Sequence, residues 1–234
     1  MPAANVDYMQ YLEYLRRPDF TFRDAEAVEE LCPSVLAVSP QSVVARRVRR
    51  GSESTAEIRI VGVSPEYQYV SDSAVEKGRF FAWPEADRRR QVVVLGAPVE
   101  ERLFPGDDPV GENVLIGGHR FRVVGVMEPQ GEMFGQSLDN YVMVPFRTLN
   151  KLFGSRLSSS LSVKTVSGES IEPAMEEVER VMRGRRGLRA GDPNNFEIIS
   201  QSQLVEMYEN LTRVTWIVMI GISAIALVVG GVGI

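Results

Sequence analysis

The chain has 234 residues and a formal net charge of −5, from 26 lysines and arginines against 31 aspartates and glutamates. This acidic balance argues against a nucleic-acid partner, because a nucleic-acid-binding surface needs a basic excess. The only cysteine, Cys32, excludes an intrachain disulfide and a cysteine-based metal site. Arginines gather in short runs at 46–50, 88–90 and 183–189, which we interpret as solvated turns and strand edges.

Residues 1–19 are interpreted as an N-terminal tail or short helix. Tyr8, Leu12 and Leu15 fall on one face at helical spacing. The segment lacks the basic-then-apolar pattern of a signal peptide. If the domain lies outside the cell, we expect its export signal to precede Met1.

The next stretch predicts a helix followed by a hairpin. Thr21 offers an N-cap oxygen, and the helix ends at about Leu31 because Pro33 disfavours the helical conformation before it. β-Branched residues and turn residues then alternate. The elements expected after the helix are a strand at 34–49, a hairpin turn at 50–52, a returning strand at 55–63 and a helical turn at 70–76 closed by Gly78.

The middle of the chain alternates short strands, turns and helices. Pro98 fits the first turn of a helix, and Gly117-Gly118 supplies the positive φ that a tight hairpin turn needs. The expected elements are a polar linker at 83–90, a strand at 91–95, a helix from Pro98 to about Leu103, a loop at 105–109, a hairpin of 113–116 with 119–126, a strand at 141–144 and a short helix after Pro145.

Met133 and Phe134 occupy a glycine-flanked loop at 131–139. Two large apolar residues in such a loop can form a tip that contacts a partner. They can equally pack back into the core of the domain, and the sequence leaves both alternatives open.

The last part of the soluble region predicts a strand, a helix and a second strand. Ser170 is the candidate N-cap of the helix, which should bury Ala174, Val178, Val181 and Met182 at spacings of three and four. The expected elements are a strand at 157–166, a helix at 171–182, a loop at 185–193 and a strand at 196–199.

A final helix is predicted from a capping box formed by Ser200 and Gln203. One face of this stalk helix, 202–213, carries four large side chains: Leu204, Met207, Tyr208 and Leu211. We expect the stalk to run directly into the apolar stretch that follows it.

Residues 214–234 contain no charged side chain and predict a transmembrane helix. Trp216 sits near the start, where an amphipathic ring rests among lipid headgroups. The alternative is a buried core helix, although core helices rarely stay apolar on every face for this length. Small residues permit close helix packing in lipid, so we expect bundle contacts at four glycines: Gly221, Gly230, Gly231 and Gly233. The span stops at Ile234 without polar flanks, so the chain is expected to be a fragment.

The predicted fold class is α+β. We expect a discontinuous porter-like domain of strand–helix–strand units at 20–77 and 156–201, with an inserted β-rich subdomain at 78–155. The stalk helix at 202–213 and the transmembrane helix at 214–234 complete the predicted organisation.

The sequence predicts no catalytic, cofactor-binding or metal site. His119 is the only histidine and lies beside a predicted hairpin turn, where we interpret it as a solvated residue. Asp107 and Asp108 could hold a hard cation, but an aspartate pair beside glycine and proline is typical of a turn. No G-x-S-x-G, H-E-x-x-H or G-x-x-x-x-G-K-[ST] motif is present. A membrane-anchored enzyme therefore remains only as an alternative with few candidate residues.

Several motifs follow one another in a specific order. They are GRFF at 78–81, VVVLG at 92–96, LFPGDDPVGENVLIGGHRFRVVGVM at 103–127, VMVPF at 142–146 and LVVGGVGI at 227–234. This succession resembles the extracytoplasmic core domain of MacB-like ABC transporter permeases, within the broader FtsX-like group. The resemblance covers nearly the whole chain from about Asp24.

The resemblance implies a domain between the first and second of four membrane helices, in the bacterial cytoplasmic (inner) membrane. It implies a second permease copy in a dimer, a cytoplasmic ABC ATPase that uses ATP, contact with membrane lipid and a periplasmic adaptor protein. The implied role is export or mechanotransmission without enzymatic chemistry in this part. The alternatives are a lipoprotein-releasing permease of the same group and a membrane-anchored sensor domain.

Overall fold

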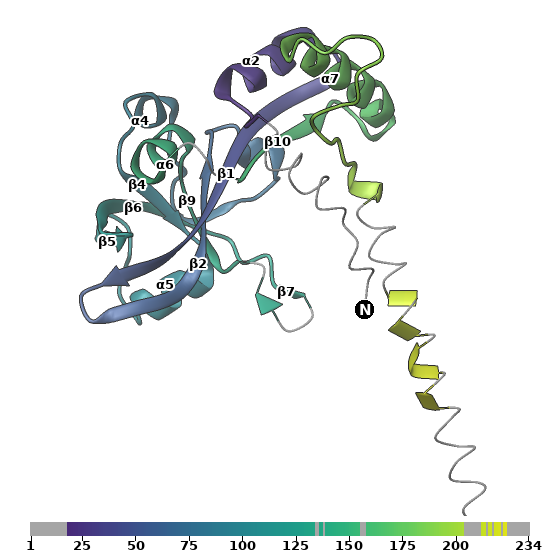
Figure 1. Ribbon diagram of the computed structural model, residues 1–234. Helices are drawn as coiled ribbons and strands as arrows, with labels where there is room; N and C mark the ends of the chain where they lie inside the picture. Colours follow the sequence, from purple (N-terminus) through teal and green to yellow (C-terminus); the bar gives the residue numbers. More distant parts are fainter. Residues whose placement is uncertain are drawn as a thin grey trace, which may run out of the picture. The chain divides into compact units, whose positions relative to one another are not determined.

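The computed structural model describes residues 18–133, 136–137, 139–154, 158–203 and, further on, 212–213, 215–216, 218–220 and 222–223. The chain divides into two compact units, Met1–Asn195 and Phe196–Ile234. The first contains a mixed α and β fold built on an eight-stranded sheet (Figure 1).

Six strands of the first unit pair in a closed ring. Around the ring, β1 pairs with β2, β2 with β9, β9 with β4, β4 with β6, β6 with β5, and β5 with β1 again. Their bounds are β1 Val35–Arg50, β2 Glu53–Val63, β4 Val92–Leu95, β5 Asn113–Ile116, β6 His119–Met127 and β9 Tyr141–Pro145. Closure removes the unpaired edges that an open sheet would expose, so this part is a small barrel.

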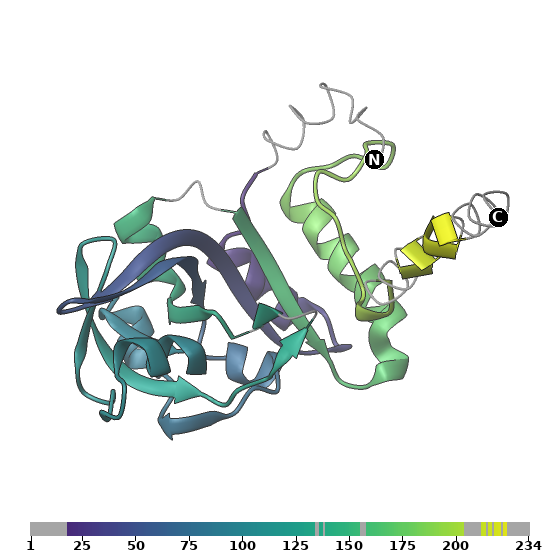
Figure 2. The ribbon, with the colours of Figure 1, turned by 90° about the horizontal axis from the view of Figure 1, so that it is seen from below.

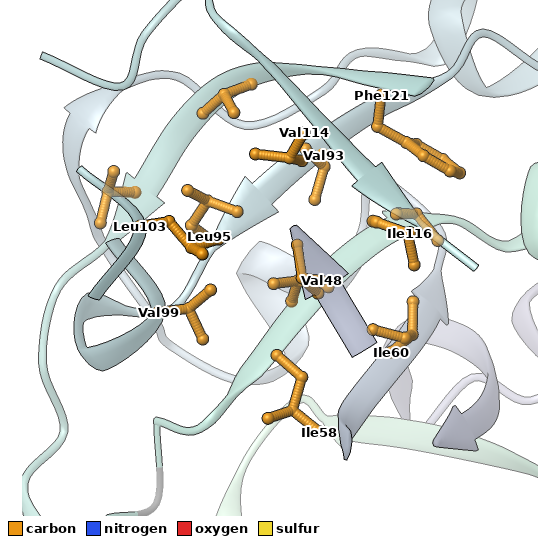
Figure 3. Packing of buried hydrophobic residues seen from close by; sticks show 14 of the residues in the cluster. Val48, Ile58, Ile60, Val93, Leu95, Val99, Leu103, Val114, Ile116 and Phe121 are labelled. Atoms are coloured by element: carbon orange, nitrogen blue, oxygen red, sulfur yellow. The ribbon is translucent and has the colours of Figure 1, made fainter. Parts of the chain in front are cut away.

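Each of the six strands sends apolar side chains into the barrel. Val48, Ile60, Leu95 and Ile116 are fully buried there, together with Phe121. Figure 3 shows these side chains converging from different strands. Two helices close over this core, with Leu103 of α5 (Ala97–Leu103) and Leu149 of α6 (Phe146–Phe153) packed into it. The barrel is therefore a filled core and encloses no channel.

A second layer lies at the other end of β1. Residues 35–43 of β1 pair with β10 (Ser158–Thr165), whereas residues 42–50 pair with β2, so one 16-residue strand belongs to both parts (Figures 1 and 2). The helices α2 (Phe22–Leu31) and α7 (Ile171–Arg185) pack against each other, and α2 also packs on β1. We call this part the helical layer.

Shorter elements complete the unit. The strand β3 (Val75–Gly78) pairs with β6 outside the ring, and β7 (Glu132–Met133) pairs with β8 (Gln136–Ser137) in a separate hairpin. The remaining elements are α3 Tyr67–Val70, α4 Trp83–Asp87 and a 3₁₀ turn at Gly168–Ser170.

Most of the predicted elements are confirmed, including the helix capped by Thr21, which ends at Leu31. The predicted helical turn at 70–76 is wrong. The helix ends at Val70, and residues from Val75 form β3 because they pair with β6. At the end of β3, Gly78 has φ +74°, and a Cβ there would collide with the backbone oxygen of Val124. This glycine thus permits a close strand approach instead of ending a helix.

Three other local predictions need correction. The polar linker at 83–90 contains α4, whose first turn holds Pro84 and whose Glu85 accepts a hydrogen bond from the backbone of Ala82. Ser170 is the N-cap residue of α7 as predicted, but its side chain makes no capping hydrogen bond, because its hydroxyl pairs with Ser167 in the 3₁₀ turn. Residues 196–199 form no strand, since no described strand pairs with them.

The division into 20–77 with 156–201 and 78–155 stays a prediction, and strands from both expected parts join one sheet. In the second unit, the capping box is confirmed: Gln203 accepts from the backbone of Ser200, whose hydroxyl accepts from the backbone of Gln203. No helix among the described residues is long and apolar enough to span a membrane. Most of 214–234 lies outside the described residues, so that span stays a prediction as well.

Candidate functional site

One side of the barrel exterior is covered by aromatic residues. Phe80 and Phe81 stack with ring centroids 4.4 Å apart, and they pack over outward-facing residues of β2, β4, β6 and β9. Tyr141 on this side is buried, and burial raises its pKa to about 12. We call this surface the covered wall; its members are Val61, Val63, Phe80, Phe81, Val92, Val94, Val124, Met127, Tyr141 and Met143. The strand β4 is consequently buried on both faces.

An aromatic cluster joins the helical layer to the barrel. The Phe22 ring of α2 meets the Trp83 ring of α4 edge-on, with centroids 5.8 Å apart. The Arg147 guanidinium lies 4.2 Å from the centroid of Phe22 and pairs with Asp87 at 3.1 Å. These four residues, which we call the junction cluster, hold the two parts together at a second place besides β1.

The helical layer is fixed internally by a charged contact. The Asp24 carboxylate accepts from the backbone and hydroxyl of Thr21 and pairs with Arg185 at 2.6 Å. Burial would raise the pKa of Asp24, but the Arg185 guanidinium and the Thr21 bonds hold it below the usual value. The contact therefore connects the start of α2 to the end of α7.

A cavity of about 650 Å³ opens at the α5 end of the barrel. Glu100 and Asp107 on its lining are already paired, with Lys77 at 3.1 Å and Arg50 at 2.9 Å respectively. The hydrogen bond that Lys77 donates to the Glu100 carboxylate raises the pKa of Lys77. Within the described part of the chain, no three His, Cys, Asp or Glu side chains are placed to hold a metal ion. Glu101 and Asp108 also line the cavity, which carries no recognisable reaction centre among the described residues.

The predicted site residues are only partly described. Met133 lies in β7 and pairs through the backbone with Gln136, in a hairpin set apart from the sheet in Figure 1, while Phe134 falls outside the described residues. The stalk face and the helix-packing glycines also fall outside them: Leu204, Met207, Tyr208, Leu211, Gly221, Gly230, Gly231 and Gly233. His119 is half-buried, edge-on to the Phe153 ring at 5.6 Å, so it is packed and not simply solvated as predicted.

Sequence reasoning missed the junction cluster and the role of GRFF. Phe22, Trp83 and Arg147 come from three distant segments, and no local pattern links them. The GRFF motif did carry a signal, because Gly78 permits the close approach of β3 while Phe80 and Phe81 cover the barrel. Its packing role was not evident without the closed ring.

Two solved extracytoplasmic regions of bacterial transporters are similar in fold to this chain. The periplasmic region of MacB from Actinobacillus actinomycetemcomitans shares the fold, with a TM-score of 0.69 and 21% identity over 83% of this chain and 86% of that one. The extracellular domain of the ABC-type transporter YknZ from Gram-positive bacteria has a TM-score of 0.62 and 26% identity, over 73% and 86% of the two chains.

The family model of the MacB-like periplasmic core domain matches residues 3–181, and the chain belongs to this family. The macrolide export ATP-binding/permease protein MacB of Azoarcus sp. (strain BH72) is 32% identical over 90% of this chain and 31% of its own length. The protein of the same name from Rhodospirillum rubrum is 30% identical over 90% of this chain and 32% of its own length. The chain thus spans about a third of the length of these relatives.

Proposed function

We propose that this chain is the extracytoplasmic core domain, with one membrane span, of an ABC transporter permease in the bacterial inner membrane. It acts in export or mechanotransmission and is driven by a cytoplasmic ABC ATPase that binds ATP. The proposed partners are a second permease copy, that ATPase, membrane lipid and a periplasmic adaptor protein. Family membership supports the transporter assignment, and the relatives named above are export proteins.

The observation that carries the transmission role is that one strand runs through both parts of the domain. Displacement of the helical layer must move the barrel, because β1 belongs to both parts and the junction cluster joins them again. A closed barrel with a filled core resists deformation. The domain can therefore transmit a displacement as one body without any catalytic group.

The second unit supports the membrane span. Trp216, Met219, Ile220 and Ile222 are more than half exposed, although each is large and apolar. Lipid accounts for such exposure on a helix. The Ser223 hydroxyl donates to the Met219 carbonyl one turn earlier, which satisfies a polar group inside the helix.

The test uses the full-length permease expressed with its ATPase. A flexible Gly-Ser insertion directly after Gln203 should abolish transport while the domain still folds and the ATPase still co-purifies. The same insertion between Ser167 and Gly168, in an exposed turn, is the matched control and should leave transport intact. Unchanged transport after the Gln203 insertion would refute the transmission role.

A further inference from the structure

The barrel exterior at β1, β5 and β6 carries a row of arginines. In the strand register, Arg49 of β1 lies opposite Leu115 of β5, and Leu115 lies opposite Arg120 of β6. Directly opposed residues in antiparallel pairs lie on the same face of a sheet. Their neighbours Val48, Ile116 and Phe121 are fully buried in the core, which leaves this row on the outside.

Two more arginines extend this row along the strands. Arg47 precedes the buried Val48, and Arg122 follows the buried Phe121, so both side chains lie on the exposed face. Arg122 pairs in register with the exposed Asn113. We call this surface the arginine wall; its members are Arg47, Arg49, Leu115, Arg120 and Arg122.

The four guanidiniums of this wall form no ion pair or side-chain hydrogen bond with any residue that the structure describes. Other arginines of the same unit form ion pairs, such as Arg50 with Asp107 and Arg79 with Glu85. Leu115, between them, is 40% exposed. The wall thus concentrates positive charge around an apolar side chain in a chain whose net charge is −5.

A groove of about 330 Å³ runs along this surface. Arg47, Arg49 and Leu115 line it, with Gly117 and Gly118 at the hairpin turn. The one acidic residue in its lining is Glu57, which lies opposite Arg47 without an ion pair among the described residues. The groove therefore offers guanidinium groups and an apolar contact to a ligand that approaches from outside.

We propose that the arginine wall is a docking surface for an acidic segment of a partner protein. Glutamate or aspartate side chains of that segment pair with the guanidiniums, whose planar shape suits carboxylates, and an apolar side chain packs on Leu115. Protein interfaces combine an apolar centre with a polar rim and are enriched in arginine, which is the composition of this wall.

The wall fits a protein segment better than a membrane or a second copy of this chain. A surface that binds a membrane by insertion presents several large apolar side chains, whereas Leu115 is the single large apolar residue of this wall. In a symmetric contact, a second copy would place its own arginine wall against this one, so guanidiniums would face guanidiniums. Charge complementarity therefore selects an acidic segment from another protein.

The test measures binding of a short fluorescent peptide of alternating glutamate and leucine by polarisation, at low and high salt. The wild-type chain should bind it with an affinity that falls as salt rises, because the contact is between exposed charges. The double variant Arg49→Glu with Arg120→Glu should bind at least about tenfold more weakly, since carboxylates then face carboxylates. A peptide with lysine in place of glutamate should not bind the wild-type chain.

The matched control is Arg88→Glu with Arg90→Glu, which makes the same charge change on exposed residues beside α4. This control should keep wild-type affinity, and circular dichroism verifies that both variants fold. Equal loss in both variants, or no loss in either, would overturn the proposal. If the peptide does not bind but phosphatidylglycerol vesicles do, and the vesicles need the wall, the wall is a membrane-binding surface instead. If the chain dimerises and Arg49→Glu abolishes the dimer, the wall is a self-association surface instead.

Discussion

The two walls of the barrel share one core but differ in what covers them. The covered wall packs Phe80 and Phe81 against the strands and buries Tyr141. The arginine wall leaves Leu115 exposed and its guanidiniums unpaired within the described chain. A barrel strand needs apolar residues only on its inner face. Burial of the outer face therefore depends on other segments that pack over it. The difference indicates that the covered wall serves stability and that the arginine wall is available for contacts.

The largest expected effect is on the covered wall. Phe81 is 2% exposed and stacks on Phe80, so Phe81→Ala removes a buried ring and leaves a cavity. It should lower the free energy of unfolding by about 3–5 kcal/mol, measured by urea denaturation. Phe81→Leu is the control and should cost clearly less. Equal stability of Phe81→Ala and the wild type would mean that this wall does not carry stability.

The buried Tyr141 gives the covered wall a pH dependence. Its folded pKa of about 12 lies above the ordinary tyrosine pKa of 10.0, so the unfolded chain releases the phenol proton first. This contribution to stability is complete below pH 10 and is lost as the pH rises through 12. Chemical unfolding between pH 9 and about pH 12 should therefore show a steeper loss in the wild type than in Tyr141→Phe. If the unfolding free energies of the two proteins fell in parallel with pH, Tyr141 would not be the cause of the pH dependence.

The junction cluster should show an intermediate effect. Arg147→Ala removes the cation–π contact with Phe22 and the ion pair with Asp87, both partly exposed. It should cost about 1 kcal/mol of unfolding free energy. The Arg147→Lys control keeps the charge but loses the planar stacking. Its free energy of unfolding should lie between those of the wild type and Arg147→Ala. A wild-type denaturation midpoint for Arg147→Ala would show that the Arg147 contacts do not help to join the two parts.

The sequence predicted most of the local elements but not the ring. Thr21 and Asp24 signal their helix within four residues, and Gly117-Gly118 signals its hairpin in the same way. The closure depends on the parallel pairs β2–β9 and β4–β6, whose partners are separated by long stretches of chain. Side chains far apart in the sequence meet only after those pairs form, so periodicity cannot predict them.

Neither wall could be predicted as a surface from the sequence. Arg47 and Arg49 were visible as part of a basic run, which we interpreted as a solvated strand edge. Arg120 and Arg122 join them only because β5 bridges β1 and β6. On the covered wall, GRFF was recognised as a motif, yet its packing over the strands requires the barrel to exist. Local signals thus identified the residues but not the surfaces that they form.

The smallest expected effect separates stability from contact on the arginine wall. Arg122→Ala removes an exposed side chain with no described ion pair, so unfolding free energy should stay within about 0.5 kcal/mol of the wild type. Arg79→Ala is the matched comparison, because Arg79 donates two hydrogen bonds to Glu85 at 2.7 and 2.8 Å and should cost more. If Arg122→Ala instead destabilised the chain by more than Arg79→Ala, the arginines of this wall would belong to the fold, and the contrast between the two walls would no longer hold.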